Sequence, residues 1–338
     1  MISRIPFRYF LLLLWGTCLG PLAAWSQCVK GDCEGGKGTY DFPNGDRYKG
    51  EFRNAAFHGQ GVYQYRNGDA YEGEWRKGEM HGKGTFTFDN GDVYEGEFEK
   101  DLKSGYGVMT LADGSRYEGT WADDQPHGKG EWKYANGTVL TGEWVAGKLN
   151  GQADYYYDNG DHYVGDYQDN QRNGHGTMTY ANGSVYEGQW KNGHRQGHGR
   201  MEYLNGTIYE GEWTRGHMTG TGKLIAPSGI EYEGEVRNGR YHGEGVLRYP
   251  NGDVYTGEFK DSRKHGHGIY QYATGDRYEG DWVMNQRHGQ GTFFYAAGGK
   301  YEGEFLSGKI HGQGTLTGAE GEVLSGRFIN GEYQSNSQ

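Results

Sequence analysis

The feature that most constrains this chain is a repeat of constant length. The segment Tyr71–Trp75, which reads Tyr-Glu-Gly-Glu-Trp, returns with few changes every 23 residues. Thirteen starts follow one another from residue 48 to residue 324 without any insertion, and a partial unit precedes the first. A fixed period of this size indicates an array of small structural units stacked in one dimension. Positions within a repeat are numbered 1 to 23 below, with position 1 at Tyr48.

Each repeat alternates in a way that predicts two strands. In Tyr71–Trp75, a ring or a glycine occupies positions 1, 3 and 5, and glutamate occupies positions 2 and 4. The segment 82–88 reads Gly-Lys-Gly-Thr-Phe-Thr-Phe and alternates in the same way. Because neighbouring side chains of a strand point to opposite faces, each repeat is expected to form an antiparallel hairpin. One face carries rings and glycines, called the inner face below, and the other, outer face is polar.

The length of the loop between repeats follows from these faces. A two-residue loop at Asn90-Gly91 would turn Tyr94 onto the polar face. A three-residue loop over 89–91, closed by a left-handed glycine, keeps Tyr94 beside Phe86 on the inner face. We therefore predict the three-residue loop.

This register predicts three rows of side chains down the sheet. One row alternates position 1 with position 16, a second consists almost entirely of glycine from positions 3 and 14, and a third alternates the ring of position 5 with glycine. Rings beside a glycine row can lean over it and cover backbone that has no side chain of its own. The expected fold class is all-β, an elongated, single-layer, twisted antiparallel sheet of tandem 23-residue β-hairpin repeats.

The repeat resembles the MORN (membrane occupation and recognition nexus) family. The resemblance lies in Tyr-Glu-Gly-Glu-Trp, a short loop, His-Gly-x-Gly and a later Asn-Gly, and it covers nearly the whole chain after residue 26. It implies an elongated, twisted or curved sheet with a grooved face, and it suggests phospholipid as one ligand. In some members the repeats accompany a lipid-kinase, methyltransferase or membrane-anchor domain. The repeats extend to residue 331 here, so we carry over none of these activities.

Composition agrees with an ordered chain that has no large globular interior. Aromatic residues make up 15% of the sequence, which argues against disorder, because disordered segments lack large apolar groups. Hydrophobic residues amount to only 34%, which is little for a closed aliphatic core of this length. The 64 glycines are not placed at every third position, which excludes collagen.

Residues 1–26 differ from the rest and are predicted to be a signal peptide. Arg4 and Arg8 precede the apolar run from Phe10 to Trp15, and Ala24-Trp25-Ser26 offers small residues where a signal peptidase cleaves. The alternative is an uncleaved anchor, but Gly16, Gly20 and Pro21 interrupt the apolar stretch and leave it short for a span. Export to the periplasm, the envelope surface or the extracellular space is therefore expected.

Two cysteines, Cys28 and Cys33, follow the cleavage site. In an oxidising compartment a short disulfide loop is the natural interpretation, because no further thiol or imidazole lies nearby to complete a metal site. The expected organisation is a signal peptide over 1–26, a disulfide-bonded cap over 27–35, the array over 36–331 and a polar tail over 332–338.

Charge argues against nucleic acid as a partner. The chain has a formal charge of −11, and removal of Arg4 and Arg8 leaves 32 basic against 45 acidic residues, or −13. An acidic protein does not attract phosphates without a compensating basic cluster. The same charge disfavours simple binding to anionic lipid.

Two repeated residue types invite a chemical interpretation. Histidine occupies position 11 seven times, but successive repeats lie two strands, about 10 Å, apart, so adjacent members cannot share one zinc ion. Carboxylates at positions 2 and 4 lie about 6–7 Å apart on a strand, within reach of glycosidic chemistry. No copy of this pair is distinguished from the others, so a solvated polar face is the preferred interpretation. We predict no metal and no cofactor.

Three functional hypotheses remain. The first is a non-enzymatic exported scaffold that binds proteins along its ring-and-glycine groove or its strand edges. The second is an envelope module that binds phospholipid or glycan, and the third, remote one is a hydrolase that uses a carboxylate pair. Homo-oligomers through the sheet edges are a further expectation, since an open sheet exposes an edge strand at each end. The candidate binding rings are Tyr71, Trp75, Tyr94, Phe98, Tyr117, Trp121, Tyr186, Trp190, Tyr209, Trp213, Tyr278 and Trp282.

Overall fold

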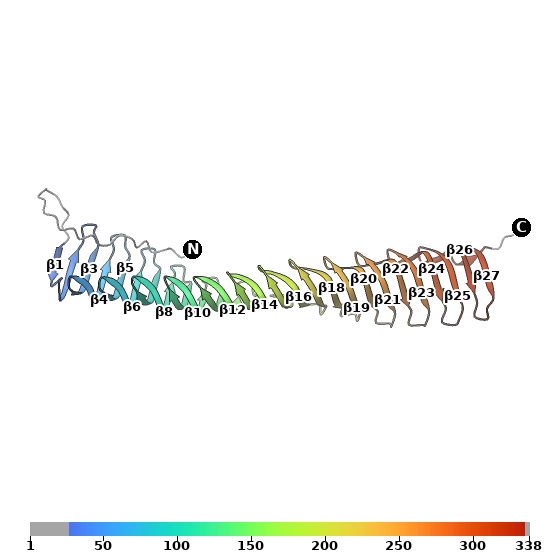
Figure 1. The fold of residues 1–338 in the computed structure, drawn as a ribbon, viewed down its shortest axis with the longest axis horizontal. Coiled ribbons are helices and arrows are strands. Elements are labelled where there is room, and N and C mark those ends of the chain that lie inside the picture. Colours follow the sequence, from blue (N-terminus) through green and yellow to red (C-terminus); the bar gives the residue numbers. More distant parts are fainter. Residues whose placement is uncertain (1–26, 335–338) are drawn as a thin grey trace. The chain divides into compact units, whose positions relative to one another are not determined.

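The computed structural model describes residues 27–334, and within them every regular element is a β-strand (Figure 1). The predicted signal peptide over 1–26 and the end of the predicted tail lie outside the described residues. Contacts divide the chain into two units, 27–170 and 171–334, which are described separately. In both units antiparallel strands follow one another in chain order, so the predicted all-β class and the hairpin repeats are confirmed.

The strands of each repeat differ in length, with seven residues in the first and nine in the second. The first unit contains β1 (Gln27–Gly31), β2 (Lys37–Asp41), β3 (Arg47–Arg53), β4 (Ala56–Gln64), β5 (Ala70–Arg76), β6 (Glu79–Thr87), β7 (Val93–Glu99), β8 (Leu102–Thr110), β9 (Arg116–Ala122), β10 (Gln125–Lys133), β11 (Val139–Val145), β12 (Lys148–Tyr156) and β13 (His162–Gln168). The second unit contains β14 (Gln171–Thr179), β15 (Val185–Lys191), β16 (His194–Glu202), β17 (Ile208–Thr214), β18 (His217–Ile225), β19 (Glu231–Arg237), β20 (Arg240–Arg248), β21 (Val254–Lys260), β22 (Arg263–Gln271), β23 (Arg277–Val283), β24 (Gln286–Phe294), β25 (Lys300–Leu306), β26 (Lys309–Thr317), β27 (Val323–Ile329) and β28 (Glu332–Tyr333).

The register between strands is the predicted one over most of each repeat. Phe86 pairs with Tyr71 on one side and with Tyr94 on the other, so positions 1 and 16 alternate down the sheet. The glycine row is continuous as well, with Gly84 paired to Gly73 and to Gly96. These pairings hold through both units and confirm the first two rows.

The predicted three-residue loop is also confirmed. The Phe88 amide donates to the Asp92 carbonyl, and the Gly91 amide donates back to the Phe88 carbonyl. Gly91 has a φ of 90°, the left-handed conformation that the turn requires. In addition, the Asp92 carboxylate accepts the amide of Ala112 in the next loop at 2.8 Å. Aspartate or serine at position 22 makes this loop-to-loop bond in several repeats of both units.

The prediction for the third row is wrong within each hairpin, because the register between its two strands shifts near the turn. Trp75 lies opposite Gly59 in the preceding strand, as predicted, but its partner within the hairpin is Met80. A β-bulge separates the Gly73–Gly84 pair from the Trp75–Met80 pair, and Gly82 in the bulge has a φ of 59°. Position 10 therefore joins the inner face beside the ring of position 5.

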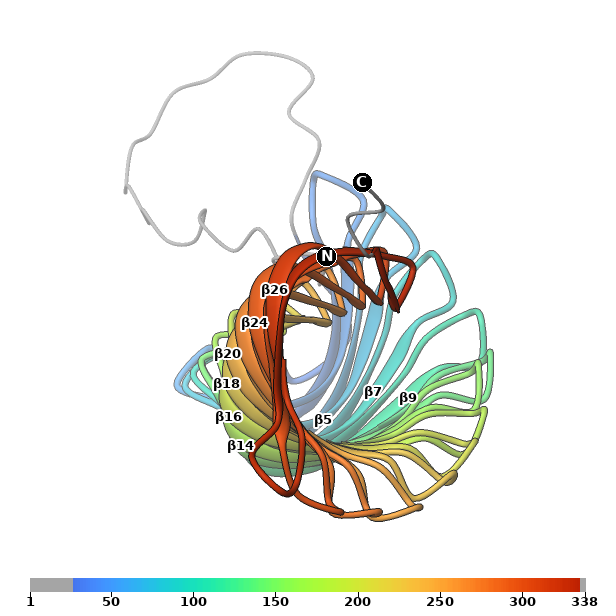
Figure 2. The same cartoon turned by 90° about the vertical axis from the view of Figure 1, so that its right-hand side faces the viewer.

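The strands of each unit are strongly curved (Figure 2). Curvature brings the side chain of position 10 against the ring of position 18 in the preceding repeat. The centroids of the Phe57 and Phe42 rings are 6.1 Å apart, and the Lys264 amine lies 5.7 Å from the centroid of Tyr249. The inner face is thereby closed over its own rings, and it forms the core of each unit without a second layer.

Hydrogen bonds from tyrosine hydroxyl groups and the packing of rings on glycines stabilise this core. The hydroxyl of each of the eleven tyrosines at position 1 donates a hydrogen bond to the backbone carbonyl of position 4. The β-bulge leaves this carbonyl without a partner in the opposite strand. Tyr71, for example, donates to the Glu74 carbonyl at 2.9 Å. The same ring covers the glycine pair, so a Cβ added at Gly84 would overlap Tyr71. Trp75 in turn donates its indole N–H to the Gly61 carbonyl at 3.1 Å.

The two ends of the array differ from its interior. Cys28 and Cys33 form a disulfide that ties β1 to the start of the array. At the other end β28 pairs with Phe328 and Ile329 of β27, so the first residues of the predicted tail extend the sheet. Leu324 of β27 is 39% exposed, whereas the position 1 tyrosines are fully buried.

Candidate functional site

The twelve rings predicted to bind a partner lie in the core. Each is at most 5% exposed, since neighbouring rings and the position 10 side chains cover it. In this conformation the groove expected along the inner face is filled, and the rings offer no surface to a ligand. The set comprises Tyr71, Trp75, Tyr94, Phe98, Tyr117, Trp121, Tyr186, Trp190, Tyr209, Trp213, Tyr278 and Trp282.

Position 18, directly before the three-residue loop, supplies aromatic rings that remain partly accessible. Tyr134 in the first unit and Tyr295 in the second are 38% and 36% exposed. The alternation of positions 12, 14, 16 and 18 already placed this ring on the inner face, but it was not among the predicted binding residues. The rings of this position, called the tyrosine row below, are Phe42, Tyr65, Phe88, Tyr134, Tyr157, Tyr180, Tyr203, Tyr249, Tyr272 and Tyr295.

Cations lie among the rings at position 10, where sequence reasoning had assigned no role. The Lys103 amine is buried between Phe88, Tyr94 and Trp121, 5.2 Å from the centroid of Trp121, and it pairs with Asp124 at 3.7 Å. Burial lowers the pKa of Lys103, and the carboxylate only partly opposes this effect.

Lys264 occupies the equivalent place in the second unit. Its amine lies 4.4 Å from the centroid of Tyr270 and 4.7 Å from that of Trp282. Burial lowers the pKa of Lys264 to about 8, while the charge of Asp253 acts in the opposite direction. The Lys103 and Lys264 amines occupy the space between the surrounding rings, so these rings leave no room for an external cation.

The carboxylates of position 4 serve the backbone. Glu258 accepts the amide of His267 at 3.0 Å, and Asp281 accepts that of Gln290 at the same distance. Each bond caps the bulge at position 13, and Glu74 does the same for Lys83. These contacts give the position 4 carboxylate a structural role in these hairpins.

No group of three or more potential ligands for a metal ion occurs among residues 27–334. His242 and His311, both at position 11, each have a buried Nδ1 atom without a hydrogen-bond partner. Within the described part of the chain no helix is long and apolar enough to cross a membrane.

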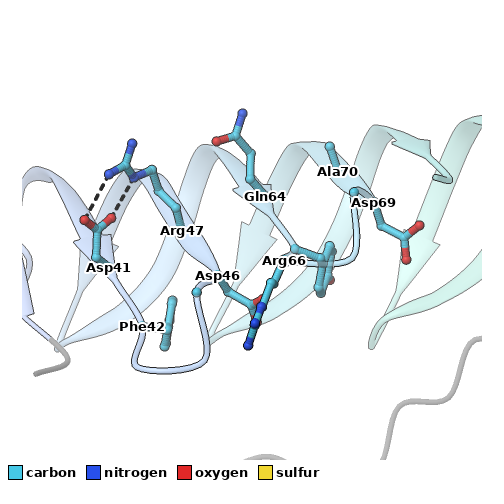
Figure 3. Close-up of a pocket in the computed structure, with 11 residues that line it drawn as sticks. Asp41, Phe42, Asp46, Arg47, Gln64, Arg66, Asp69 and Ala70 are labelled. Atoms are coloured by element: carbon cyan, nitrogen blue, oxygen red, sulfur yellow. Dashed lines mark hydrogen bonds and ion pairs between the residues drawn. The ribbon is translucent and has the colours of Figure 1, made fainter. Parts of the chain in front are cut away.

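A surface hollow lies between the first two three-residue loops of the array (Figure 3). It is an open space of about 620 Å³, and Phe42, Asp46, Arg66 and Asp69 are among its lining residues. At its edge Arg47 makes two hydrogen bonds to the Asp41 carboxylate. The Asp46 carboxylate is already bonded to the Tyr63 hydroxyl and the Arg66 amide, so the hollow is a gap between linked turns.

Comparison with known proteins identifies the repeat. A model described as "MORN repeat" matches thirteen consecutive segments, from 34–47 and 48–70 through to 278–300 and 301–323. The chain belongs to the MORN-repeat family. A full MORN match such as 71–93 starts at the buried position 1 tyrosine and contains one hairpin, here β5 and β6. No curated protein matches the chain.

Several solved structures share a distant likeness with this MORN-repeat chain. The TCP10 domain of Danio rerio CPAP in complex with a STIL peptide is 13% identical, covers 70% of this chain and 99% of its own, and has a TM-score of 0.37. The TCP domain of Drosophila melanogaster SAS-4 with a proline-rich motif of Ana2 is 15% identical, covers 53% and 85%, and has a TM-score of 0.28. Virginiamycin B lyase from Staphylococcus aureus is 10% identical, covers 79% and 83%, and scores 0.14. Identities and TM-scores this low imply nothing about what the chain binds.

Proposed function

We propose that this MORN-repeat chain is a non-enzymatic, exported scaffold that binds protein partners along the tyrosine row. The observation that carries the proposal is the partial exposure of this row beside a closed core. A tyrosine ring offers a large apolar area and a polar tip at small entropic cost, and tyrosine is enriched at protein interfaces. Export is inferred from the sequence of residues 1–26.

The arrangement of the row suits an extended partner. Within each unit two strands separate successive copies of position 18, so rings in consecutive repeats stand about 10 Å apart. The row is interrupted at Leu111 in the first unit and at Ala226 in the second. The rings are held by the loop-to-loop bonds of position 22, which fix the turns before a partner arrives. Such pre-ordering reduces the entropy lost on binding.

The absence of enzymatic activity remains part of the proposal. It is supported by four carboxylates of position 4, which each accept a backbone amide in the same way, namely Glu74, Glu235, Glu258 and Asp281. A hydrolase would need one pair with a different environment, because catalysis requires groups whose pKa values are tuned apart.

Affinity capture from cells that make the protein tests the proposal. The double variant Tyr134→Ser/Tyr295→Ser removes the two most exposed rings of the row. Tyr106→Ser is the matched control, since Tyr106 is 52% exposed on the outer face, where it bonds to Glu118. Stoichiometric partners are expected with the wild type and the control, and a clear loss is expected with the double variant. Equal capture by all three proteins, or no protein partner at all, would contradict the proposal.

A further inference from the structure

Four consecutive two-residue turns of the second unit are unusually basic for an acidic chain. Four consecutive turns, 191–194, 214–217, 237–240 and 260–263, carry six cations and one acidic residue, Asp261. All six cationic side chains are exposed. This group, called the basic rim below, consists of Lys191, Arg215, Arg237, Arg240, Lys260 and Arg263.

The same turns in the first unit are balanced. The five turns between residues 53 and 148 contain five basic and five acidic residues. Both sets of turns occupy positions 6 to 9 of the repeat, on the same kind of hairpin. The basic rim is therefore not a requirement of the fold.

Like charges face one another in the basic rim. Arg237 lies directly opposite Arg240 across its turn, and Lys260 lies directly opposite Arg263. Such pairs destabilise a hairpin, whereas the equivalent pair in β5 and β6 is the favourable Arg76 and Glu79. A local cost of this kind points to a function that requires the charge.

Nearby carboxylates do not neutralise these pairs. Arg240 and Asp261 lie 3.8 Å apart, and both side chains are well exposed to solvent, so the interaction is weak. Among the described residues this is the one ion pair that the rim makes. The closest carboxylates along the strands, Glu235 and Glu258, accept the amides of Glu244 and His267 instead.

Further positive charge lies directly behind the rim. The Arg195 guanidinium stacks on Trp213 at 4.2 Å and donates to the Gly216 carbonyl at 2.8 Å. Arg172, also at position 10, donates to the Gly193 carbonyl of the first rim turn at 2.9 Å. These planar groups belong to position 10, the residue that follows each turn, and they add to the potential that an anion meets.

The spacing of the rim fits an extended polypeptide. Consecutive turns are two strand spacings, about 10 Å, apart, and an extended chain advances about 3.3 Å per residue. A carboxylate at every third residue therefore meets successive turns, and about nine residues cover all four. The sixteen residues of these turns include no large apolar side chain that could insert into a bilayer, which favours a peptide over a membrane surface.

We propose that the basic rim binds an extended acidic segment of a partner protein, with carboxylates recurring about every third residue. The proposal rests on the proposed scaffold function and specifies the chemistry of one partner. The basic rim supplies positive charge at a spacing that matches the carboxylates of the segment. The tyrosine row is a separate surface at the opposite ends of the strands.

Fluorescence anisotropy with labelled synthetic peptides tests the proposal on residues 27–338. One probe is a twelve-residue peptide of four Glu-Ser-Gly units, and the second has the same composition with its glutamates contiguous. The rim variant is Arg215→Gln/Arg237→Gln/Arg240→Gln/Arg263→Gln. The control variant, Arg53→Gln/Arg76→Gln/Lys77→Gln/Lys100→Gln, changes net charge equally in the turns of the first unit. Circular dichroism establishes that both variants fold.

The spaced peptide is expected to bind wild type and control within about twofold of one another, and the rim variant on the order of tenfold more weakly, with binding that falls as salt rises. Equal weakening in both variants, or no preference for spaced glutamates, would overturn the proposal. Rim-dependent binding of phosphatidylserine vesicles or of alginate, with no peptide binding, would overturn it in favour of a lipid or a polysaccharide. Peptide binding is read independently of cellular capture, so its failure leaves the result for Tyr134 and Tyr295 intact.

Discussion

At the residue scale, tyrosine and glycine depend on one another. The position 1 ring lies over the position 14 glycine of its own repeat, and its hydroxyl bonds to the bulge. One repeat departs from this arrangement twice, with Leu140 at position 1 and Ala153 at position 14. Leu149 approaches Gly142 there and fills space that the ring occupies elsewhere. An alanine fits this repeat because the tyrosine is absent.

A double-mutant cycle tests this dependence. Gly84→Ala should destabilise the protein by about 1–3 kcal/mol, since the new methyl group overlaps the Tyr71 ring. In a Tyr71→Leu background the same change should cost clearly less, which gives a favourable coupling energy. Denaturant titration measures all four proteins, with Ala153→Gly as the control at the natural exception. Additive effects of Tyr71→Leu and Gly84→Ala would contradict the packing described.

Lys264 predicts a pH dependence of stability. Its folded pKa of about 8 lies below the usual value near 10.4, so the unfolded chain binds more protons between these two pH values. The free energy of unfolding should therefore rise from pH 7 to pH 9.5, by roughly 1–2 kcal/mol after allowance for solvent screening. Lys264→Met should remove this rise, whereas Lys309→Met, at an exposed turn, should retain it. Identical pH profiles for the wild type and Lys264→Met would show that burial does not disfavour the charge.

At the element scale, each hairpin is tied to the next through its loops. The Asp253 carboxylate accepts the Ala273 amide at 2.8 Å and the Tyr270 hydroxyl at 2.7 Å. The bond from Ala273 contributes most to lowering the pKa of Asp253. The charged carboxylate is thus part of the link between neighbouring hairpins.

Removing this link should loosen one junction. Asp253→Ala is expected to cost about 1 kcal/mol and to speed hydrogen exchange at the Ala273 amide. Glu320→Ala, in the last three-residue turn, makes the same change of charge at a residue that has no hydrogen bond within residues 27–334. Unchanged exchange at Ala273 would mean that the loops are not coupled through position 22.

Much of each hairpin could be predicted from the sequence. Strict alternation around Phe86 and the need to keep Tyr94 on the inner face were enough to predict strand pairing and loop length. The bulge at position 12 was missed, because a glycine there was interpreted as a partner for the ring of position 5. Position 10 was missed for the same reason, since its place on the inner face follows only from the shifted register.

At the scale of the whole molecule, curvature decides which surfaces are free. The twelve predicted binding rings were chosen on the assumption of an open groove, but curvature closes that groove within each unit. Alternation in the sequence predicts to which face of the sheet a ring points, but it carries no information on how strongly the strands bend. It therefore could not distinguish an open groove from a closed core. The surfaces that remain are the outer face, the tyrosine row and the turns.

The disulfide gives a prediction about the first edge of the array. Cys28 and Cys33 hold β1, whose five residues are all exposed and which, among residues 27–334, pairs with β2 alone. Replacing both cysteines by serine should free this strand and increase self-association, because open edges pair with other chains. Size-exclusion chromatography at increasing concentration measures the effect. Identical elution of the variant and the wild type would show that the disulfide does not protect this edge from self-association.

Tryptophan fluorescence tests most directly whether the inner face is a closed core. All seven tryptophans of residues 27–338 lie on this face and are at most 9% exposed. In the folded protein, iodide should quench their emission only weakly, with a spectrum shifted to the blue, and unfolding in denaturant should abolish both properties. Strong quenching by iodide in the folded protein would show that the rings line an open groove, and would contradict the account.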